Sequence, residues 1–390
     1  MMLLSWLLIF ILCFLGLWIT GCFDKHKADE RRKTIIVLGS GGHTAEMLKF
    51  LKTLKVELLG ERVYVIAGSD IGSLSKIMEF ENGVEHLNIE YIPRSREVGQ
   101  SYFTSVFTTL YSMLYCTLVI EKVAPDLVIA NGPGTCLPIL FCAWIHKTLG
   151  LSRCKLVLLE SYACVKNRSL TGRLMLPFVD KYFVQWPSLL STSSKVVYSG
   201  RVPISAFREK FPRRVEKPRT LDTSSYVLVV VGSTNFDNLI RSIDTEEFAR
   251  KLHAIGYNGI KIQVGTGTYQ VTALHSFSSS KFQVEIHKFI FDWEYKVRSA
   301  SLVIGHSGAG TILDALEFGK PLIVVENECL MNRHQSEITG MMRDLGYIVS
   351  SDLNHLVDEI EQLCKATTYC LQFPKTESGV FRDYIESLYK

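Results

Sequence analysis

The sequence predicts an α/β protein built from two parallel-sheet domains, and three observations indicate this fold class. Short apolar runs are followed by glycine-rich turns and then by helix-like periodic segments, which is the order of βαβ units. Both halves of the chain repeat this plan. The chain has 390 residues, of which 47% are apolar. That length suffices for about two to three domains, and that composition for large cores.

An uncharged segment at the start of the chain is expected to be a transmembrane helix. Residues 1–23 carry no charged side chain, and about 20 apolar residues span a bilayer. Basic residues first occur between Lys25 and Lys33, which favours a cytosolic position for the body of the protein. A signal peptide is one alternative, and a lipoprotein cleavage box at Ile19–Cys22 is another. A glycan on the sequon at Asn167 would place the body in the lumen instead.

The first predicted strand, Thr34–Leu38, leads into a glycine turn and a helix. The turn comprises Gly39, Ser40, Gly41 and Gly42. It can hold a phosphate or pyrophosphate, but Thr44 stands where a dinucleotide fingerprint needs glycine, which disfavours a plain nicotinamide oxidoreductase. His43 lies at the helix start, where the dipole favours the neutral imidazole, so it could take a proton from a sugar hydroxyl. A capping role is the alternative for His43.

Further strands are predicted in the first half at Arg62–Ala67, Leu87–Ile92, Asp126–Ala130, Lys155–Leu159 and Tyr182–Gln185. Asp70 follows the first of these strands and Glu160 follows the fourth, so both belong to loops at the carboxyl edge of the sheet. Both are candidate bases. Each could instead cap the next helix, which is the preferred interpretation for Asp70. A second Gly/Pro turn, Asn131–Thr135, also joins a strand to a helix.

A long helix is predicted over Ser101–Val123. Aromatic residues recur every four positions on one of its faces, at Phe103, Phe107, Tyr111 and Tyr115. Such a stripe usually packs in a core, which is our first interpretation. The alternative is a surface that meets a membrane or a lipid, because Arg94 and Arg96 precede the helix and could contact lipid phosphate.

The second half opens with Arg201–Thr223, which is rich in proline and basic residues and is expected to be a linker. Tyr226–Val231 then starts a second sheet and leads into a turn that contains Gly232, Ser233 and Thr234. Two later strands, Leu302–His306 and Leu322–Glu326, lie on either side of a predicted helix. The turn before that helix comprises Ser307, Gly308, Ala309, Gly310 and Thr311.

This second turn is predicted to bind a nucleotide diphosphate. It has almost no side chains, and its amides lie at a helix N-terminus, where the dipole favours an anion. Asn332, His334 and Gln335 follow the next strand at the carboxyl end of the sheet and are placed to read a sugar. The alternative is that the glycines only permit tight packing.

Other features of the sequence exclude several functions. The net charge of +4, with no basic run interleaved with aromatic residues, gives no support for nucleic-acid binding. Ten cysteines without a C-x-x-C pair indicate reduced thiols rather than disulfides or a zinc site. The chain has no Asp-x-Asp, so no metal bridging a diphosphate is expected. Val380–Lys390 is expected to form a closing helix that packs on the first domain or lies on the surface.

Eight motifs carry a family resemblance. Those of the first half are Gly39–Met47, Pro93–Ser101, Asn131–Thr135 and Val184–Trp186. They resemble the membrane-anchor subunit of the UDP-N-acetylglucosamine transferase of dolichol-linked oligosaccharide synthesis. Those of the second half are Val231–Asp237, His306–Gly310, Gly319–Pro321 and Asn327–Gln335. They resemble the catalytic subunit of the same enzyme, so the two subunits are expected to be fused here.

The resemblance implies a GT-B glycosyltransferase, with two Rossmann-like domains facing a cleft. The expected acceptor domain is 33–200 and the expected UDP-sugar domain is 224–365, with a tail at 366–390. The implied donor-binding residues are Gly232, Ser233, Thr234, His306, Ser307, Gly308, Ala309, Gly310, Thr311, Asp314, Asn332, His334 and Gln335. Asp314 would contact the ribose, with Glu317 as a fallback. The implied acceptor-binding residues are Gly39, Ser40, Gly41, Gly42, Arg94, Arg96, Asn131 and Gly132.

The resulting hypothesis is an inverting transfer of N-acetylglucosamine from UDP-GlcNAc to O4 of GlcNAc-diphosphodolichol, without a cofactor or a metal. The candidate bases, in order, are His43, Glu160 and Asp70, with His306 last. The expected location is the endoplasmic reticulum membrane, with one span and a cytosolic body, where other enzymes of the pathway could dock. The alternatives are a membrane-tethered scaffold that binds nucleotide sugar without turnover, and a related UDP-sugar:lipid transferase with another donor or acceptor.

Overall fold

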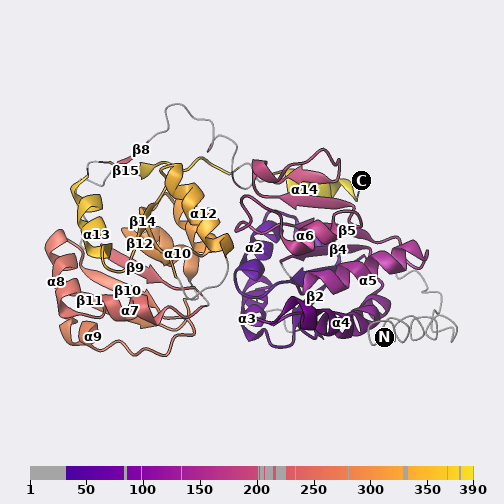
Figure 1. The fold of residues 1–390 in the computed structure, drawn as a ribbon, viewed down its shortest axis with the longest axis horizontal. Coiled ribbons are helices and arrows are strands. Elements are labelled where there is room, and N and C mark those ends of the chain that lie inside the picture. Colours follow the sequence, from indigo (N-terminus) through magenta and orange to yellow (C-terminus); the bar gives the residue numbers. More distant parts are fainter. Residues whose placement is uncertain are drawn as a thin grey trace. The chain divides into compact units, whose positions relative to one another are not determined.

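The computed structural model describes most of the chain beyond residue 31. The described residues are 32–82, 86–97, 99–132, 134–200, 202, 206, 214–216, 225–232, 234–279, 281–290, 292–327, 333–366, 368–376 and 379–389. The expected anchor, residues 1–23, lies outside them, as does most of the expected linker 201–223. Within these ranges the chain forms two parallel sheets, each with its own helices, and a small antiparallel pair of strands (Figure 1).

The first sheet has seven strands in the order β3-β2-β1-β4-β5-β6-β7. Its strands are β1 (Lys33–Leu38), β2 (Glu61–Ala67), β3 (Asn88–Ile92), β4 (Leu127–Asn131), β5 (Lys155–Leu159), β6 (Lys181–Val184) and β7 (Val196–Tyr198). The helices between them are α2 (Gly42–Leu51), α3 (Ile71–Phe80), α4 (Tyr102–Val123), α5 (Cys136–Thr148) and α6 (Leu170–Met175), with short 3-10 turns at Val56–Leu59 and Pro187–Leu189.

The second sheet has six strands in the order β11-β10-β9-β12-β13-β14. They are β9 (Tyr226–Val230), β10 (Gly259–Gln263), β11 (Gln283–His287), β12 (Leu302–His306), β13 (Leu322–Val325) and β14 (Val349–Ser351). Its helices are α7 (Asp237–Ile243), α8 (Glu246–Ile255), α9 (Ala273–Phe277), α10 (Trp293–Ser299), α11 (Ala309–Glu317), α12 (Arg333–Asp344) and α13 (Leu356–Lys365). Strands β8 (Arg214–Glu216) and β15 (Thr368–Leu371) pair antiparallel, and α14 (Gly379–Ser387) closes the chain.

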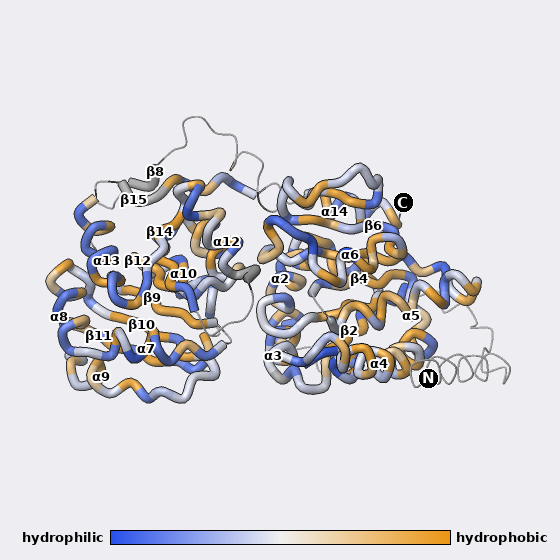
Figure 2. The backbone as a smooth tube through the Cα atoms, in the orientation of Figure 1, coloured by the Kyte–Doolittle hydropathy of each residue, from blue (hydrophilic) through white to orange (hydrophobic). Residues whose placement is uncertain are grey.

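The predicted strands are confirmed with boundary differences of at most one residue, and most of them are short runs of buried aliphatic side chains. In β9, for example, all five residues are buried. The strands at the centre of each sheet carry the hydrophobic colour in Figure 2. Helices α8 and α13 bury one face each against the second sheet, through side chains such as Leu252 and Ile360. Both sheets are therefore parallel sheets whose faces are covered, as their apolar strands require.

Each sheet reverses its strand order once, and this reversal positions the candidate site. In the first sheet, β2 and β3 lie on one side of β1 and β4 lies on the other. In the second sheet, β10 and β11 lie on one side of β9 and β12 lies on the other. Ligands of open α/β sheets bind beyond the carboxyl ends of the strands at such a switch point. The glycine turns after β1, β4, β9 and β12 are the loops at these two points.

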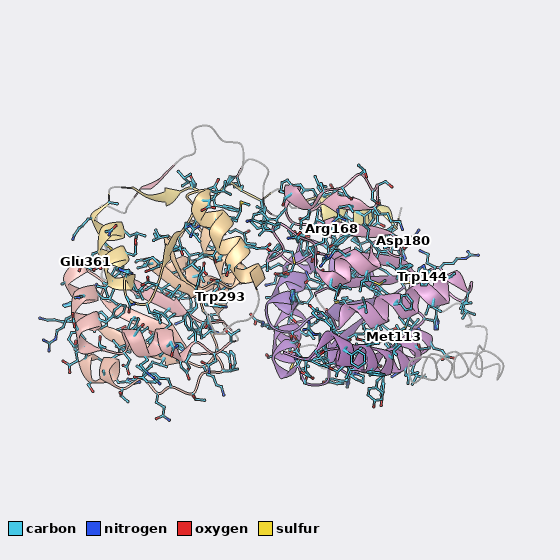
Figure 3. All side chains as sticks on the ribbon, viewed as in Figure 1. Met113, Trp144, Arg168, Asp180, Trp293 and Glu361 are labelled. Carbon is cyan, nitrogen blue, oxygen red and sulfur yellow. The ribbon has the colours of Figure 1, made fainter. Side chains whose placement is uncertain are left out.

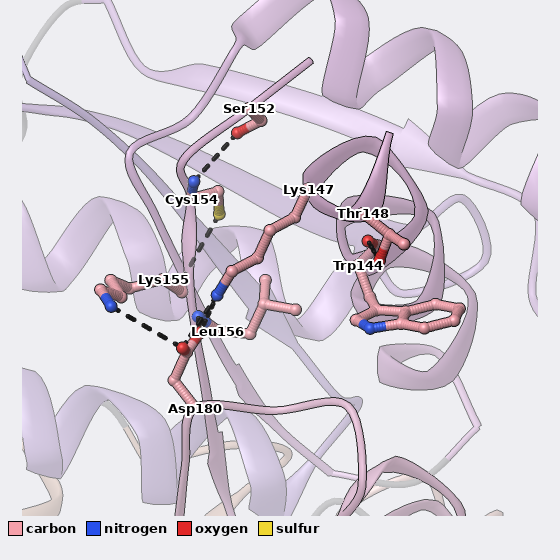
Figure 4. Close-up of polar contacts among 8 residues, drawn as sticks. All are labelled: Trp144, Lys147, Thr148, Ser152, Cys154, Lys155, Leu156 and Asp180. Carbon is pink, nitrogen blue, oxygen red and sulfur yellow. Dashed lines mark hydrogen bonds and ion pairs between the residues drawn. The ribbon is translucent and has the colours of Figure 1, made fainter. Parts of the chain in front are cut away.

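At the amino-terminal ends of the strands of the first sheet, the carboxylate of Asp180 is fully engaged in contacts within the domain. Asp180 accepts hydrogen bonds from Lys147 Nζ at 2.7 Å and from the Leu156 amide at 2.8 Å, and Lys155 Nζ lies 3.8 Å away (Figure 4). These contacts tie the end of α5 to the start of β5. These contacts give Asp180 a structural role.

The expected closing helix is confirmed as one that packs on the first domain. Phe381 of α14 is fully buried, with its ring centroid 5.2 Å from that of Phe50 on α2 and 5.3 Å from that of Phe183 on β6. Ile385, one turn later, is also fully buried. The last helix of the chain thus completes the core of the domain with which the chain begins.

The core interpretation of the aromatic stripe on α4 was wrong. Phe103, Tyr111 and Tyr115 are 68%, 53% and 41% exposed. Helix α4 instead buries its other face, which includes Met113 (labelled in Figure 3) and Cys116. Both faces of this helix are apolar, so the period of the sequence could not choose between them. The exposed stripe supports the alternative interpretation, a surface that meets a membrane or a lipid.

Helix α4 is also long and apolar enough to cross a membrane by length and composition, and it is the one such helix in the described part of the chain. One third of its apolar span is buried in the fold. It packs against α5 and β3 of the first sheet. These contacts make α4 an integral layer of the first domain with one apolar face left outside.

Candidate functional site

The turn after β12 is organised around the ring of His306. This side chain is 5% exposed and lies against two glycines. A Cβ on Gly232 would come 2.7 Å from His306 Cε1, and a Cβ on Gly308 would come 2.5 Å from the same atom. Gly232 also has φ +66°, which disfavours any side chain. The ring therefore requires glycine on both sides and fixes the two turns at the switch point of the second sheet.

The same environment keeps His306 neutral. Burial lowers the pKa of this imidazole to about 4, while a hydrogen bond with the Val230 backbone acts in the opposite direction. A ring that resists protonation is a poor general base. His306, ranked last among the candidate bases, thus has the geometry of a group that orients the turn.

The start of α11 offers the features of an anion site. Gly308 is its N-cap and no side chain caps the helix, so the first amides have no partner within the helix. These amides belong to Ala309, Gly310 and Thr311. Ser307 Oγ is buried and makes no hydrogen bond with any described residue. A hydroxyl and several amides at the positive end of a helix suit the oxygens of a diphosphate.

Asp314 lies one turn further along α11 and is already used within the domain. Its Oδ2 accepts a hydrogen bond of 2.7 Å from Trp293 Nε1, a residue of α10 labelled in Figure 3. The side chain is buried. Its expected contact with a ribose remains a prediction, as does the fallback contact of Glu317, which is exposed at the end of the helix.

The remaining expected donor residues are only partly described. Thr234 Oγ1 donates to the Val231 carbonyl at 2.8 Å, which closes the turn after β9. Asn327 Nδ2 donates to the Asn235 carbonyl at 2.9 Å and links the loop after β13 to the same turn. Ser233, Asn332 and the side chains of His334 and Gln335 lie outside the described residues, so their roles stay predictions.

In the first sheet the two glycine turns meet at the switch point. Leu38, Asn131 and Leu159 end β1, β4 and β5 in one register, and the Gly39 amide donates to the Asn131 carbonyl at 3.1 Å. Gly41 has φ +67° and forms the N-cap of α2, so the turn of Gly39, Ser40, Gly41 and Gly42 delivers His43 to the first turn of the helix. The predicted acceptor turns are therefore neighbours.

Asn131 is the most unusual polar group at this edge. It is fully buried, and neither Oδ1 nor Nδ2 forms a hydrogen bond with a described residue. Leaving a buried amide without partners costs about 1–3 kcal/mol. The next residue, Gly132, has φ +122°, so the backbone turns sharply here. A buried amide kept at this cost supports the predicted contact between Asn131 and a polar ligand.

The loop with Arg94 and Arg96 lies beside this turn. A Cβ on Gly134 would be 3.8 Å from the Cβ atoms of Arg96 and Ser95. Arg94 Nη1 lies 3.3 Å from Glu97 Oε2. Arg96 donates to the Gln100 carbonyl at 2.9 Å, and its guanidinium lies 4.0 Å from the ring centroid of Tyr102. Arg96 thus comes close to the turn after β4, and each arginine is held by its own loop, so their contact with an acceptor stays a prediction.

Asp70 and Glu160, two of the candidate bases, are occupied in the fold. Asp70 caps α3, where it accepts from the Ser73 amide at 3.2 Å and from the Ser73 hydroxyl at 2.5 Å. This confirms the capping interpretation. Glu160 is buried and accepts from the Ser161 amide at 3.0 Å and the Ser169 amide at 2.8 Å, and also from the Tyr182 hydroxyl.

These hydrogen bonds change the interpretation of Glu160 as a candidate base. With both oxygens engaged, this carboxylate shapes the loop after β5 rather than accepting a proton from a substrate. Glu160 also affects the neighbouring Tyr182. Burial raises the pKa of the Tyr182 hydroxyl, and the charge of Glu160 raises it further. His43 is therefore the candidate base that the geometry favours.

Sequence reasoning missed one group beside His43. Glu46 Oε2 lies 3.5 Å from His43 Nδ1, and the carboxylate is 4% exposed. The signal was available, because residues three apart on a helix share a face. The long-range partner of Glu46, Ser161, could not be predicted from spacing, since 115 positions separate the two.

Comparison with known proteins assigns the first half of the chain. A family model described as "Oligosaccharide biosynthesis protein Alg14 like" matches residues 34–202. The UDP-N-acetylglucosamine transferase subunit ALG14 of Yarrowia lipolytica is 38% identical over 172 residues, which are 43% of this chain and 80% of that protein. The human protein of the same name is 41% identical over 182 residues, or 44% and 84% of the two chains.

The chain belongs to the Alg14 family. Its second half adds a domain of a different kind, since a model described as "Glycosyltransferase family 28 C-terminal domain" matches residues 226–380. An Alg14 half and a family 28 glycosyltransferase domain are therefore joined in one polypeptide, as the motifs led us to expect.

Solved structures confirm that the fused Alg14 chain has the GT-B fold, with two Rossmann-like parallel-sheet domains. MurG of Acinetobacter baumannii superposes with a TM-score of 0.60 and 14% identity, over 92% of this chain and 99% of that one. The UDP-GlcNAc 2-epimerase of Neisseria meningitidis bound to UDP-GlcNAc gives the same four values. At this level of identity the likeness concerns the fold alone.

Proposed function

We propose that this chain is an inverting glycosyltransferase that moves N-acetylglucosamine from UDP-GlcNAc to O4 of GlcNAc-diphosphodolichol. The product would be the β-1,4-linked chitobiosyl lipid of N-glycan precursor assembly. The observation that carries the proposal is the fusion of an Alg14 half with a family 28 glycosyltransferase domain. Relatives of the first half are named as subunits of a UDP-N-acetylglucosamine transferase. A single chain with both parts would hold the whole activity.

The donor would bind at the second sheet. Its diphosphate would lie at the start of α11, against the amides of the turn and Ser307 Oγ, with His306 holding the turn in shape. As the bond from C1 to the UDP oxygen breaks, negative charge grows on the leaving diphosphate. Fixed amide dipoles stabilise such a charge without reorganising. We expect no metal to be needed for this step, so turnover should persist in the presence of EDTA.

The acceptor would bind at the switch point of the first sheet, near Asn131 and the turn that precedes His43. Its O4 attacks C1 of the donor from the side opposite UDP, which inverts the anomeric centre. His43 takes the O4 proton as the new bond forms. General-base help of this kind is worth about 10²–10⁴-fold in rate. His43 is partly exposed, at 27%, and is thus accessible to a substrate, unlike Glu160 or Asp70.

A lipid-linked acceptor requires a protein that works at a membrane. The exposed apolar face of α4 supports such a location, together with the uncharged residues 1–23 of the sequence. We propose one span at the endoplasmic reticulum membrane, with the body in the cytosol. Asn167 is exposed, so its sequon can report on this topology. We expect it to carry no glycan in the native protein.

The decisive experiment is a product assay on the purified full-length chain. Labelled UDP-GlcNAc and a short-chain GlcNAc-diphosphate-prenol acceptor are supplied in detergent, with UDP-GalNAc and UDP-glucose in parallel. We expect one GlcNAc to be transferred, and linkage analysis of the released disaccharide to give the β-1,4 bond. His43→Ala should lower turnover by about 10²–10⁴-fold and leave the Kd for UDP nearly unchanged.

Each outcome of this assay discriminates between functions. Binding of UDP-GlcNAc without product in a single-turnover experiment would reject catalysis in favour of a nucleotide-sugar-binding scaffold. Preference for another donor would keep the reaction class but replace the substrate. Unchanged turnover of His43→Ala would remove the proposed base.

A further inference from the structure

Glu46 lies on the same face of α2 as His43, one turn later, and is buried in the first domain. Its exposed fraction is 4%, and its Oε2 atom makes no hydrogen bond with a described residue. The nearest partner given by the structure is His43 Nδ1, at 3.5 Å. Catalytic hydrogen bonds are often long before substrate binds and tighten in the reacting complex. A buried carboxylate directed at an imidazole in this way is therefore poised for a charge-assisted bond.

The other oxygen of Glu46 is fixed from a distant part of the chain. Ser161 Oγ donates to Glu46 Oε1 at 3.1 Å, and the Ser161 amide donates to Glu160 Oε1 at 3.0 Å. Ser161 Oγ also accepts from the Ala163 amide at 3.2 Å. The loop after β5 thus orients Glu46, and Glu160 orients the loop. This arrangement gives Glu160 a role in the site that does not require it to touch a substrate.

The position of His43 explains why a carboxylate is needed. The N-terminus of a helix disfavours a positive charge, and a base that takes a proton becomes an imidazolium. A negative charge next to Nδ1 offsets this penalty, as in other sites where a carboxylate orients a histidine and stabilises its charged form.

Glu160, Tyr182 and Cys164 are titratable groups in this part of the domain. Glu160 lies at the end of β5, and Tyr182 of β6 donates to it. Burial raises the pKa of the nearby Cys164 thiol, and the charges of Glu160 and then Glu46 raise it further. Arg168 supplies a positive charge nearby, with its guanidinium 5.9 Å from the centroid of the Tyr182 ring.

We propose that Glu46 is the positioning residue of His43. It orients the neutral ring from 3.5 Å away and stabilises the imidazolium that forms when the ring takes the proton of the attacking hydroxyl. The O–H bond of the acceptor breaks as its oxygen bonds to C1, and the electron pair of the C1–O bond leaves with UDP. This inference rests on the proposed function, because it assigns His43 the role of base.

The test is Glu46→Gln in the full-length chain, read by kinetics and by NMR. We expect kcat to fall about 10- to 100-fold, a part of the 10²–10⁴ that general-base help supplies, with the KM for UDP-GlcNAc within about twofold. The pKa of His43, followed by NMR of labelled histidine and assigned with His43→Gln, should fall by about one unit or more, because an opposite charge within 4–6 Å raises it by that much. The basic group in the pH profile of kcat/KM should shift equally.

Three further variants make the test specific. Glu46→Asp should restore part of kcat, because it keeps the charge. Ser161→Ala removes the bond to Glu46 Oε1 and should shift the same pKa in the same direction by less, and it covers the case in which Glu46→Gln does not fold. Glu79→Gln, an exposed carboxylate on α3, is the matched control and should change neither quantity.

The two readouts separate the inference from the proposed function. A His43 pKa that is unchanged in Glu46→Gln and in Ser161→Ala overturns the pairing, whatever the kinetics show. A lowered pKa with unchanged kcat overturns the part of Glu46 in the reaction. Full turnover of His43→Ala instead refutes the proposed base, while the NMR titration still decides whether Glu46 holds the ring.

Discussion

His43 and His306 occupy similar places in the two domains and have opposite environments. Each lies at a switch point, next to a glycine turn that leads into a helix. His306 is 5% exposed and is wedged between Gly232 and Gly308, whereas His43 is 27% exposed and faces the buried carboxylate of Glu46. The His306 ring is held by close packing against two glycines, and the His43 ring lies beside a carboxylate.

The comparison teaches that the local motif does not set the chemistry of its histidine. A buried imidazole without a carboxylate partner among the described residues loses stability when it is protonated, which suits a rigid part of a phosphate turn. A partly exposed imidazole beside a carboxylate is accessible to a substrate and has a negative charge nearby. The same strand–turn–helix motif therefore holds a buried, neutral ring in one domain and, in the function we propose, the base in the other. Three predictions test this contrast.

The largest expected effect is on the pH dependence of unfolding. Burial lowers the pKa of His306 to about 4 from an ordinary 6.5, so the unfolded chain binds this proton more tightly. The stabilising contribution is complete above about pH 6.5 and is lost as the pH falls through about 4. At about 1.4 kcal/mol per pKa unit, it is on the order of 3 kcal/mol. Chemical denaturation at pH 7.5 and at pH 4.5 should show that the free energy of unfolding falls less between these two pH values in His306→Gln than in the native protein.

His86→Gln, at an exposed histidine, is the control for this measurement and should lose as much stability as the native chain. If His306→Gln also loses that amount, His306 is not the buried neutral group described here, and the contrast between the two rings fails.

The second prediction concerns the glycines on the helix side of each turn. Gly308→Ala places a Cβ 2.5 Å from His306 Cε1, and overpacking of this kind costs about 1–3 kcal/mol. Gly42→Ala meets no atom within 4 Å and lies in the first turn of α2. Thermal unfolding should show a lower Tm for the first variant and an equal or higher Tm for the second. Equal losses would show that His306 is not clamped.

The smallest expected effect is at Ser307. Its hydroxyl makes no hydrogen bond with a described residue, so Ser307→Ala should change the free energy of unfolding by less than about 0.5 kcal/mol. If the hydroxyl binds the diphosphate, the same variant should weaken UDP binding by about 1.5 kcal/mol, or roughly tenfold. Calorimetric titration with UDP measures this. A large loss of stability with unchanged affinity would assign Ser307 to the fold rather than to the anion site.

Several parts of the site follow from local sequence alone. The strand runs, the glycine turns and the place of His43 and Ser307 at helix starts depend on neighbouring residues and on short periods, so the sequence predicts them. The pairing of His43 with Glu46 was also within reach, because it needs only helical spacing. Asp70 as a helix cap belongs to the same class.

The tertiary structure determines the contacts between residues that are far apart in the sequence. Ser161 donates a hydrogen bond to Glu46, which is 115 positions away in the sequence, and Glu160 accepts hydrogen bonds from Ser169 and Tyr182. The face of α4 that stays outside, with Phe103, Tyr111 and Tyr115, could not be predicted because both faces are apolar. Local periodicity determines which segments form strands and helices. Burial, exposure and the pairing of charges depend on the long-range packing of those segments, which no local pattern contains.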